Sequence, residues 1–310
     1  MIHAETLELL EWPRLCQQLA TFAATKLGQT AAQHLKIPAD VEETLELLGQ
    51  TREAYQLEQS TTAGLSFGGV KDIGEALERS ELQGILGGNE LLAIATTLAG
   101  ARQLRRVIDS QENLPVLQSL TADLRTYPEL EQAIHHCIDD RGQVTDRASL
   151  KLEGIRQQLK TIRDQIYEKL QRIMQRQSGA VQEQLITQRG DRFVLPVKAP
   201  QKDAIPGIVH DASTSGVTLY IEPHSIVELG NRLRQWKRQE QAEEEAIRRT
   251  LTEKVAEVKL DLERLLIIVT SLDLAVARAR YSLWLEANPP RFIDWGQGDR
   301  RQETGDRRQE

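Results

Sequence analysis

The sequence predicts a mainly α-helical protein that carries one small β-rich insertion. Apolar residues make up 40% of its 310 positions, whereas aromatic residues make up only 4%. A core rich in Leu, Ile and Ala but poor in aromatic side chains suits helix packing better than a β-sandwich. Two long apolar stripes at helical spacing flank a short stretch that has the pattern of β-hairpins.

Residues 1–145 are expected to form a compact helical unit. Apolar residues recur at three- to five-residue steps over 1–36, and similar patterns cover 40–60, 90–109 and 115–138. Connections that contain glycine or proline separate these segments, as is typical of helices joined by turns.

A long helix is predicted over 146–183. From Leu152 to Ile173, apolar residues fall at steps of three or four, which places them on one helix face. At 1.5 Å per residue such a helix is roughly 55 Å long, and Thr145 or Asp146 is expected to cap it.

A second long helix is predicted over 224–270, followed by a return helix over 271–294. The apolar stripe runs from Leu229 to Leu272 but is interrupted over 237–246, where the residues are polar on all sides. We expect this interruption to be exposed to solvent all round. The two long helices are expected to fold back on each other as an antiparallel pair.

Residues 184–223, called the tip from here on, are predicted to form two β-hairpins. The segments 184–188 and 192–197 flank a three-residue loop, Arg189-Gly190-Asp191. The segments 207–211 and 217–221 flank a second turn in the same way.

The charge is unevenly distributed along the chain. The net charge is −7, yet residues 141–240 hold 17 Lys and Arg against 11 Asp and Glu, whereas residues 1–140 hold 10 against 21. This asymmetry favours one region that faces a polyanion on an otherwise acidic body. The alternative is solubilising charge that is simply spread unevenly.

Basic side chains of the tip and of the helix that follows it are candidates for phosphate contacts. Lys and Arg on turn-rich protrusions suit such contacts. The alternative for each of them is a solvated surface position. The candidate nucleic-acid contacts are Arg189, Arg192, Lys198, Lys202, His210, Arg232 and Arg234.

Signals for catalysis, metals or membranes are weak. The sequence contains no Gly-Lys dipeptide and hence no phosphate-binding loop of the G-x-x-x-x-G-K-[ST] type. His135-His136-Cys137 are adjacent, so on a helix they point in different directions, and with Cys16 as the only other cysteine a zinc site is not expected. No apolar run reaches the length of a membrane span, and we expect a cytoplasmic protein with no catalytic residues, cofactor or metal of its own.

Several segments together resemble the family of the second bacterial MutS paralogue, called MutS-two. The resemblance covers about residues 1–294 and is most specific in the tip. It is carried by the segments Phe193–Lys198, Ile205–Pro223, Val227–Leu229, Asn231–Leu233, Thr6–Leu10, Gly68–Ile73, Ser271–Asp273 and Ala277–Ala279.

The resemblance implies a MutS-type architecture and function. The helical core (1–145) would carry two lever helices (146–183 and 224–270) with the tip as a clamp, and 271–294 would return into the core. The family is implied to bind branched or mismatched DNA with ATP and Mg, to suppress homologous recombination and, in some bacteria, to split collided ribosomes. Its partners would then be DNA junctions or ribosomal RNA.

The chain departs from the family after Asp294. There the family continues towards an ATPase domain and a Smr nuclease domain, whereas this chain repeats the hexapeptide GDRRQE within 295–310, which we expect to be disordered. We therefore expect a nucleic-acid-binding core and clamp portion that neither hydrolyses ATP nor cuts DNA alone. The alternative is an interaction scaffold or a non-functional remnant that needs a separately encoded ATPase part. A homodimer is a further expectation.

Overall fold

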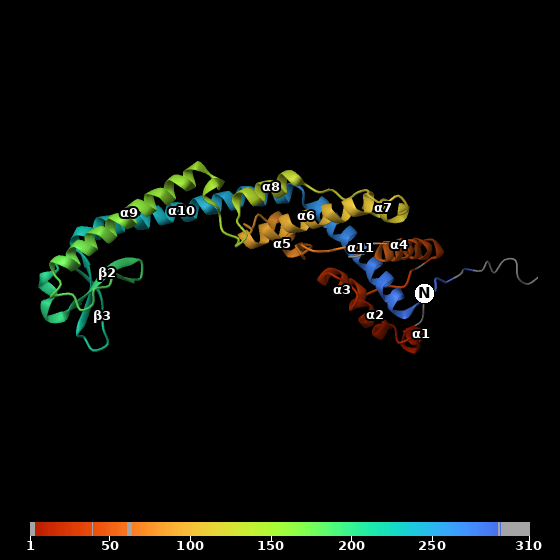
Figure 1. Cartoon of the computed structure of the whole chain (residues 1–310), viewed down its shortest axis with the longest axis horizontal. Helices are drawn as coiled ribbons and strands as arrows, with labels where there is room; N and C mark the ends of the chain where they lie inside the picture. The colour runs from red at the N-terminus through yellow and green to blue at the C-terminus, as the bar shows by residue number, and fades with distance from the viewer. Residues whose placement is uncertain (1–3, 39, 61–63, 291, 293–310) are drawn as a thin grey trace, which may run out of the picture. The chain divides into compact units, whose positions relative to one another are not determined.

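The computed structural model confirms the predicted fold class, a mainly helical chain with one small antiparallel sheet (Figure 1). It describes residues 4–38, 40–60, 64–290 and 292. The predicted disordered tail, 295–310, lies outside these described residues. The chain divides into two units, of which the first comprises Met1–Asp72, Gly100–Arg125 and Arg264–Glu310 and the second Ile73–Ala99 and Thr126–Glu263.

The first unit is helical in its described residues. Its helices are α1 (Ala4–Leu9), α2 (Trp12–Ala20), α3 (Lys26–Gln33), α4 (Val41–Ser60), α7 (Pro115–Thr121), and the parts of α6 (Gly88–Asp109) and α11 (Lys259–Leu285) that belong to this unit.

A buried carboxylate holds the start of α3 against α11. Asp273 is fully buried and accepts hydrogen bonds from the backbone N–H groups of Ala24 and Thr25, both at 2.8 Å, and from Oγ1 of Thr25 at 2.6 Å. The same Thr25 hydroxyl caps α3 by accepting from the N–H of Gly28 at 2.9 Å. Asp273 thus ties two segments that lie about 250 positions apart in the sequence.

A second buried carboxylate caps α7. Glu53 on α4 accepts from the N–H groups of Val116 and Leu117, at 3.0 and 2.8 Å. These donors lie in the first turn of α7, where N–H groups have no partner within the helix. Acidic residues of the N-terminal region therefore satisfy helix ends as well as supplying solubility.

The second unit contains a pair of long helices that ends at the sheet (Figure 1). Its other helices are α5 (Gly74–Glu81), the first part of α6 and α8 (Pro128–Cys137). The long helices are α9 (Leu150–Arg176) and α10 (His224–Glu257), here called the arm. Arg156 contacts Glu240 while Lys169 contacts Ser225, so the two helices are antiparallel, as predicted.

The long helices are shorter than predicted. Helix α9 begins at Leu150 because the Ser149 hydroxyl caps it, accepting from the N–H of Leu152 at 3.0 Å, whereas Asp146 only begins a short 3₁₀ turn. The second predicted helix, 224–270, is divided at Val258, whose ψ of 14° departs from helical geometry. Helix α11 (Lys259–Leu285) then covers the first part of the predicted return segment, 271–294.

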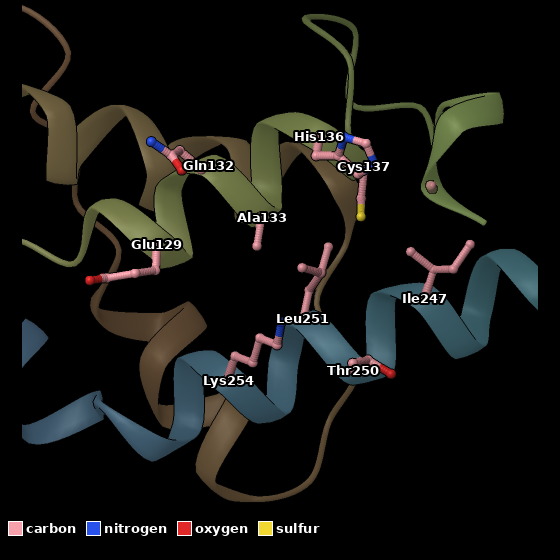
Figure 2. A pocket seen from close by; sticks show the side chains of 10 residues that line it. Glu129, Gln132, Ala133, His136, Cys137, Ile247, Thr250, Leu251 and Lys254 are labelled. Carbon is pink, nitrogen blue, oxygen red and sulfur yellow. The ribbon is translucent and has the colours of Figure 1, made fainter.

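A cavity of about 660 Å³ lies between α8 and α10 (Figure 2). Ala133 and Leu251 contribute apolar walls, and Cys137 and Lys254 point towards the same space. Burial raises the pKa of the Cys137 thiol, and the nearby positive charge of Lys254 offsets part of this rise. The thiol is therefore protonated at neutral pH and behaves as an apolar wall of the cavity.

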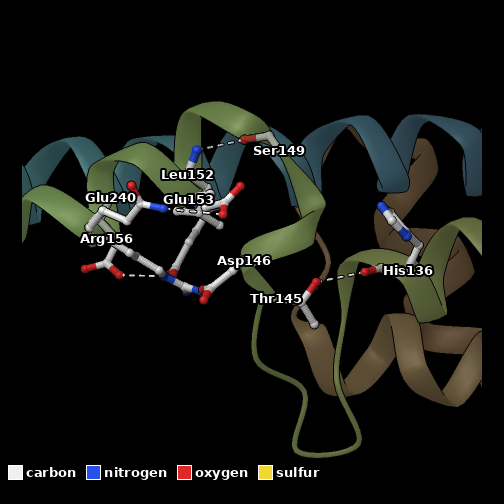
Figure 3. A network of polar contacts seen from close by, with 10 residues as sticks. His136, Thr145, Asp146, Ser149, Leu152, Glu153, Arg156 and Glu240 are labelled. Atoms are coloured by element: carbon white, nitrogen blue, oxygen red, sulfur yellow. Dashed lines mark hydrogen bonds and ion pairs between the residues drawn. The ribbon is translucent and has the colours of Figure 1, made fainter. Parts of the chain in front are cut away.

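A layer of ion pairs interrupts the apolar contact between α9 and α10 (Figure 3). Arg156 on α9 donates from Nε to Glu240 at 2.9 Å and from Nη2 to Glu244 at 2.7 Å, and it also pairs with Asp146. Burial alone would lower the pKa of Arg156, but the hydrogen bonds to these carboxylates raise it. The prediction that 237–246 is exposed on every side is therefore wrong, because one of its sides faces α9.

The tip folds into a four-stranded antiparallel sheet. The strand order is β1-β2-β4-β3, formed by β1 (Thr187–Arg189), β2 (Arg192–Lys198), β3 (Gly207–Ala212) and β4 (Thr218–Pro223). Phe193, Leu195 and Val197 alternate along β2 and pack in one core with apolar side chains of α9 and α10. The sheet is thereby fixed to the end of the arm.

The first hairpin is tighter than predicted. Arg189 pairs directly with Arg192, so the loop consists of Gly190 and Asp191 alone rather than three residues. Gly190 adopts φ 58°, the left-handed conformation that two-residue hairpin loops require and that glycine adopts without steric cost.

Candidate nucleic-acid interface

A β-bulge at His210 shapes the polar side of the tip. Val209 pairs with Ile221, but the next pairing joins Asp211 to Tyr220, so His210 is an extra residue in β3. Without the bulge, His210 would face Tyr220 and Asp211 would point to the opposite side of the sheet. The bulge instead lets two consecutive side chains make contacts across the sheet, His210 with Glu222 on the neighbouring β4 and Asp211 with Arg189 on the opposite edge strand, β1.

One buried carboxylate, Glu222, organises these contacts. It is only 1% exposed, and its two oxygens accept from Nη1 of Arg192 at 3.0 Å and from Nε2 of His210 at 2.7 Å. Gly230 on α10 makes this packing feasible, since a Cβ there would lie 2.9 Å from Oε1 of Glu222. A buried carboxylate with two such donors is compensated, so Arg192 and His210 hold the tip together.

The network continues onto α10. Nη2 of Arg192 donates to Oδ1 of Asn231 at 2.9 Å, and Nη2 of Arg234 donates to the same oxygen at 3.0 Å. The structure therefore brings three of the predicted contact residues, Arg192, His210 and Arg234, into one group around Glu222 and Asn231.

Arg189 is held over the ring of Tyr220 on β4. Its guanidinium carbon lies 3.6 Å from the centroid of the Tyr220 ring, a cation–π contact. Nε donates to Asp211 at 2.9 Å, and Nη1 donates to the carbonyl oxygen of Gln188 at 3.0 Å. The charge of Arg189 is thus paired within the protein, although about a third of the side chain, 33%, is exposed.

The remaining candidates fall into two kinds. Nζ of Lys198 donates to the carbonyl oxygen of Gly179 at 2.9 Å, which joins β2 to the turn that follows α9. Lys202 and Arg232 are exposed, and their side chains make no hydrogen bond or ion pair with any described residue. Among the seven predicted residues, these two carry positive charge that is fully available to a ligand.

Sequence reasoning missed the acidic and aromatic partners of these cations. Glu222, Asp211, Tyr220 and Asn231 were not predicted as site residues, yet they determine how the cations are held. One local signal was available, because Glu222 stands between Ile221 and Pro223 at the end of an apolar strand. An acidic residue in that position predicts a buried partner of opposite charge.

Within the described ranges, no three His, Cys, Asp or Glu side chains come together as metal ligands. His135 and His136 instead contribute their backbone carbonyls, which accept from the Arg147 guanidinium at 2.9 Å. None of the helices in the described ranges holds an apolar run that would bridge a bilayer.

The chain is similar to bacterial proteins named endonuclease MutS2. It is 59% identical over 295 residues to the endonuclease MutS2 of Synechocystis, an alignment that covers 95% of this chain and 36% of the relative. It is 37% identical over 301 residues to the endonuclease MutS2 of a Geobacillus strain, with 95% and 38% covered. It is 35% identical over 298 residues to the putative endonuclease MutS2 of Bacillus subtilis, with 94% and 38% covered.

The chain spans little more than a third of the length of these curated relatives. No protein-family model matches the chain. The alignments cover 94–95% of this chain. The chain is therefore a homologue of these MutS2 endonucleases over one part of their length.

Proposed function

We propose that this chain supplies nucleic-acid binding to a MutS2-type protein and that the tip is the contacting surface. The observation that carries the proposal is a pair of exposed cations, Lys202 in the tip and Arg232 in the part of α10 next to it. Both lie within residues 141–240, where Lys and Arg outnumber Asp and Glu by 17 to 11. The name endonuclease, borne by the relatives, describes an enzyme that acts on nucleic acid.

The contact would be electrostatic and independent of base sequence. An exposed Lys or Arg side chain reaches a phosphate without giving up an internal partner, whereas Arg192 would leave the buried Glu222 uncompensated. Binding of this type releases counterions and weakens steeply as salt is added. Branched DNA in the cytoplasm is the ligand that the family resemblance favours, and the binding would need neither ATP nor a metal ion in this chain.

The test is a salt titration of the full chain against a labelled four-way DNA junction. The variant carries Lys202→Glu and Arg232→Glu together. We expect it to bind at least about tenfold more weakly at low salt, and its salt slope to fall by about 0.9 for each phosphate that it no longer binds. Titrations with ATP and Mg, and with a ribosomal RNA hairpin, are run in parallel.

Lys26→Glu is the matched control. Lys26 is an exposed cation of the first unit at the start of α3, where an acidic residue is favourable for the helix dipole. The Lys26→Glu substitution changes the net charge by the same amount as each substitution in the double variant, but it leaves the tip unchanged. Equal affinity and equal slope for the wild type and the double variant would contradict the proposal.

A further inference from the structure

We propose that Arg189 and Tyr220 form a platform on which an unpaired nucleobase stacks. This inference rests on the proposed nucleic-acid binding and names the part of the ligand that this point of the tip recognises. The platform is separate from the exposed cations that would contact phosphate, since neither Lys202 nor Arg232 takes part in it.

The platform is rigid before any ligand arrives. The Arg189 guanidinium lies on the Tyr220 ring at 3.6 Å, and bonds to Asp211 and to the Gln188 carbonyl fix its plane. The hydroxyl of Thr187 accepts a longer bond from Nη1 at 3.4 Å. A side chain of this length is usually mobile, so its fixation in advance removes an entropic cost from binding.

The surroundings of Arg189 favour a neutral base over a phosphate. Asp211 already neutralises the guanidinium at 2.9 Å, and half of its own side chain is exposed, at 51%. A phosphate that approached Arg189 would therefore meet a carboxylate of like charge. A base is uncharged, and planar guanidinium groups stack well on bases.

The β-bulge in β3 is what builds this arrangement. It places Asp211, rather than His210, opposite Tyr220. In a regular ladder the carboxylate would point to the other side of the sheet and could not hold the Arg189 plane. Bulges commonly re-aim a side chain in this way beside functional sites.

The consequence is a preference for nucleic acid that contains unpaired bases. In a duplex the bases are stacked on one another and cannot reach the platform, whereas a single-stranded overhang or an open junction offers a free base. Unpaired bases of DNA and of RNA can both stack in this way, so the experiment compares the two nucleic acids.

The experiment uses the full chain and a duplex with a short single-stranded overhang that contains 2-aminopurine, a base whose fluorescence changes on stacking. A fully paired duplex of the same length is the reference, and the overhang is prepared as DNA and as RNA. We expect the wild type to bind the overhang more tightly than the duplex and to quench the probe. A larger effect with RNA than with DNA would identify RNA as the source, and the reverse would identify DNA.

The decisive variant is Arg189→Lys, which keeps the positive charge near Asp211 but removes the planar group. Base stacking contributes about 1–3 kcal/mol per base, so we expect overhang affinity to fall about tenfold, duplex affinity to fall less, and quenching to disappear. Arg172→Lys on α9, an exposed arginine paired with Glu168, is the control that leaves all values unchanged.

The outcomes separate this inference from the proposed function. Wild-type binding that is equal for overhang and duplex, with no quenching, overturns the stacking platform while nucleic-acid binding stands. The same follows if Arg189→Lys retains the wild-type preference and quenching. No binding of any nucleic acid overturns the proposed function and the platform together.

Discussion

The helical first unit and the tip both bury carboxylates, but they satisfy them differently. Asp273 and Glu53 accept hydrogen bonds mainly from backbone N–H groups at helix ends. Glu222 accepts from the side chains of Arg192 and His210. An acid of the first kind fixes a helix end without using a cation, whereas an acid of the second kind withdraws cations from any external ligand.

This difference shows why a count of charges overstates a binding surface. Residues 141–240 carry a surplus of Lys and Arg. Within that range, Arg156 serves the arm, Arg192 serves Glu222 and Arg189 pairs with Asp211. The charge that is fully available to a ligand is the part that neither internal acids nor other internal hydrogen-bond acceptors engage.

The largest effect is expected for Asp273→Ala in the first unit. The substitution removes three hydrogen bonds to a buried side chain and leaves the N–H groups of Ala24 and Thr25 without their acceptor. We expect a loss of about 3 kcal/mol in unfolding free energy, measured by urea denaturation.

Glu112→Ala is the control for this prediction, because Glu112 is an exposed acid of the same unit. Junction binding by the Asp273 variant is expected to persist wherever the protein remains folded. A loss below about 0.5 kcal/mol would show that Asp273 does not anchor α3. It would contradict the claim that buried acids of the first unit stabilise the fold by accepting hydrogen bonds from helix ends.

A smaller effect is expected for Arg156→Ala in the arm. The substitution leaves Glu240 and Glu244 half-buried, next to each other and without their cation. Because the site is partly exposed to solvent, we expect a loss of about 1–3 kcal/mol by urea denaturation. Lys160→Ala, an exposed position one turn further along α9, is the control.

A triple replacement tests whether the ion pairs around Arg156 stabilise the arm beyond compensating their own charges. Changing Arg156, Glu240 and Glu244 together to Leu removes the charges along with the need to compensate them. Replacement of an ion-pair network by packed apolar residues is often neutral or stabilising, so we expect the triple variant to recover most of the loss. A triple variant as unstable as Arg156→Ala would show that the layer does more than compensate its own charges.

The fold could be predicted largely from periodicity, and its errors have local causes. The stripe from Leu152 to Ile173 predicts α9, and the strand patterns predict both hairpins. The break at Val258 was missed because apolar spacing continues through it towards Leu262. The polar layer around Arg156 was missed because periodicity shows where apolar residues point but not which charges face each other.

The candidate site was predicted by residue type but not by arrangement. Arg192 and Glu222 lie 30 positions apart, and Arg189 and Asp211 lie 22 apart. Pairing over such distances depends on strand register, which the single extra residue His210 shifts. Composition alone therefore identifies a cation-rich stretch, residues 141–240, but cannot separate structural cations from available ones.

Hydrogen–deuterium exchange of the full chain, with and without a DNA junction that carries a single-stranded arm, tests the central claim most directly. We predict new protection in residues 187–223 and in the first turns of α10, and unchanged exchange around Asp273 and Glu53 in the first unit. Protection confined to the first unit, with none in the tip, would contradict the assignment of binding to the tip.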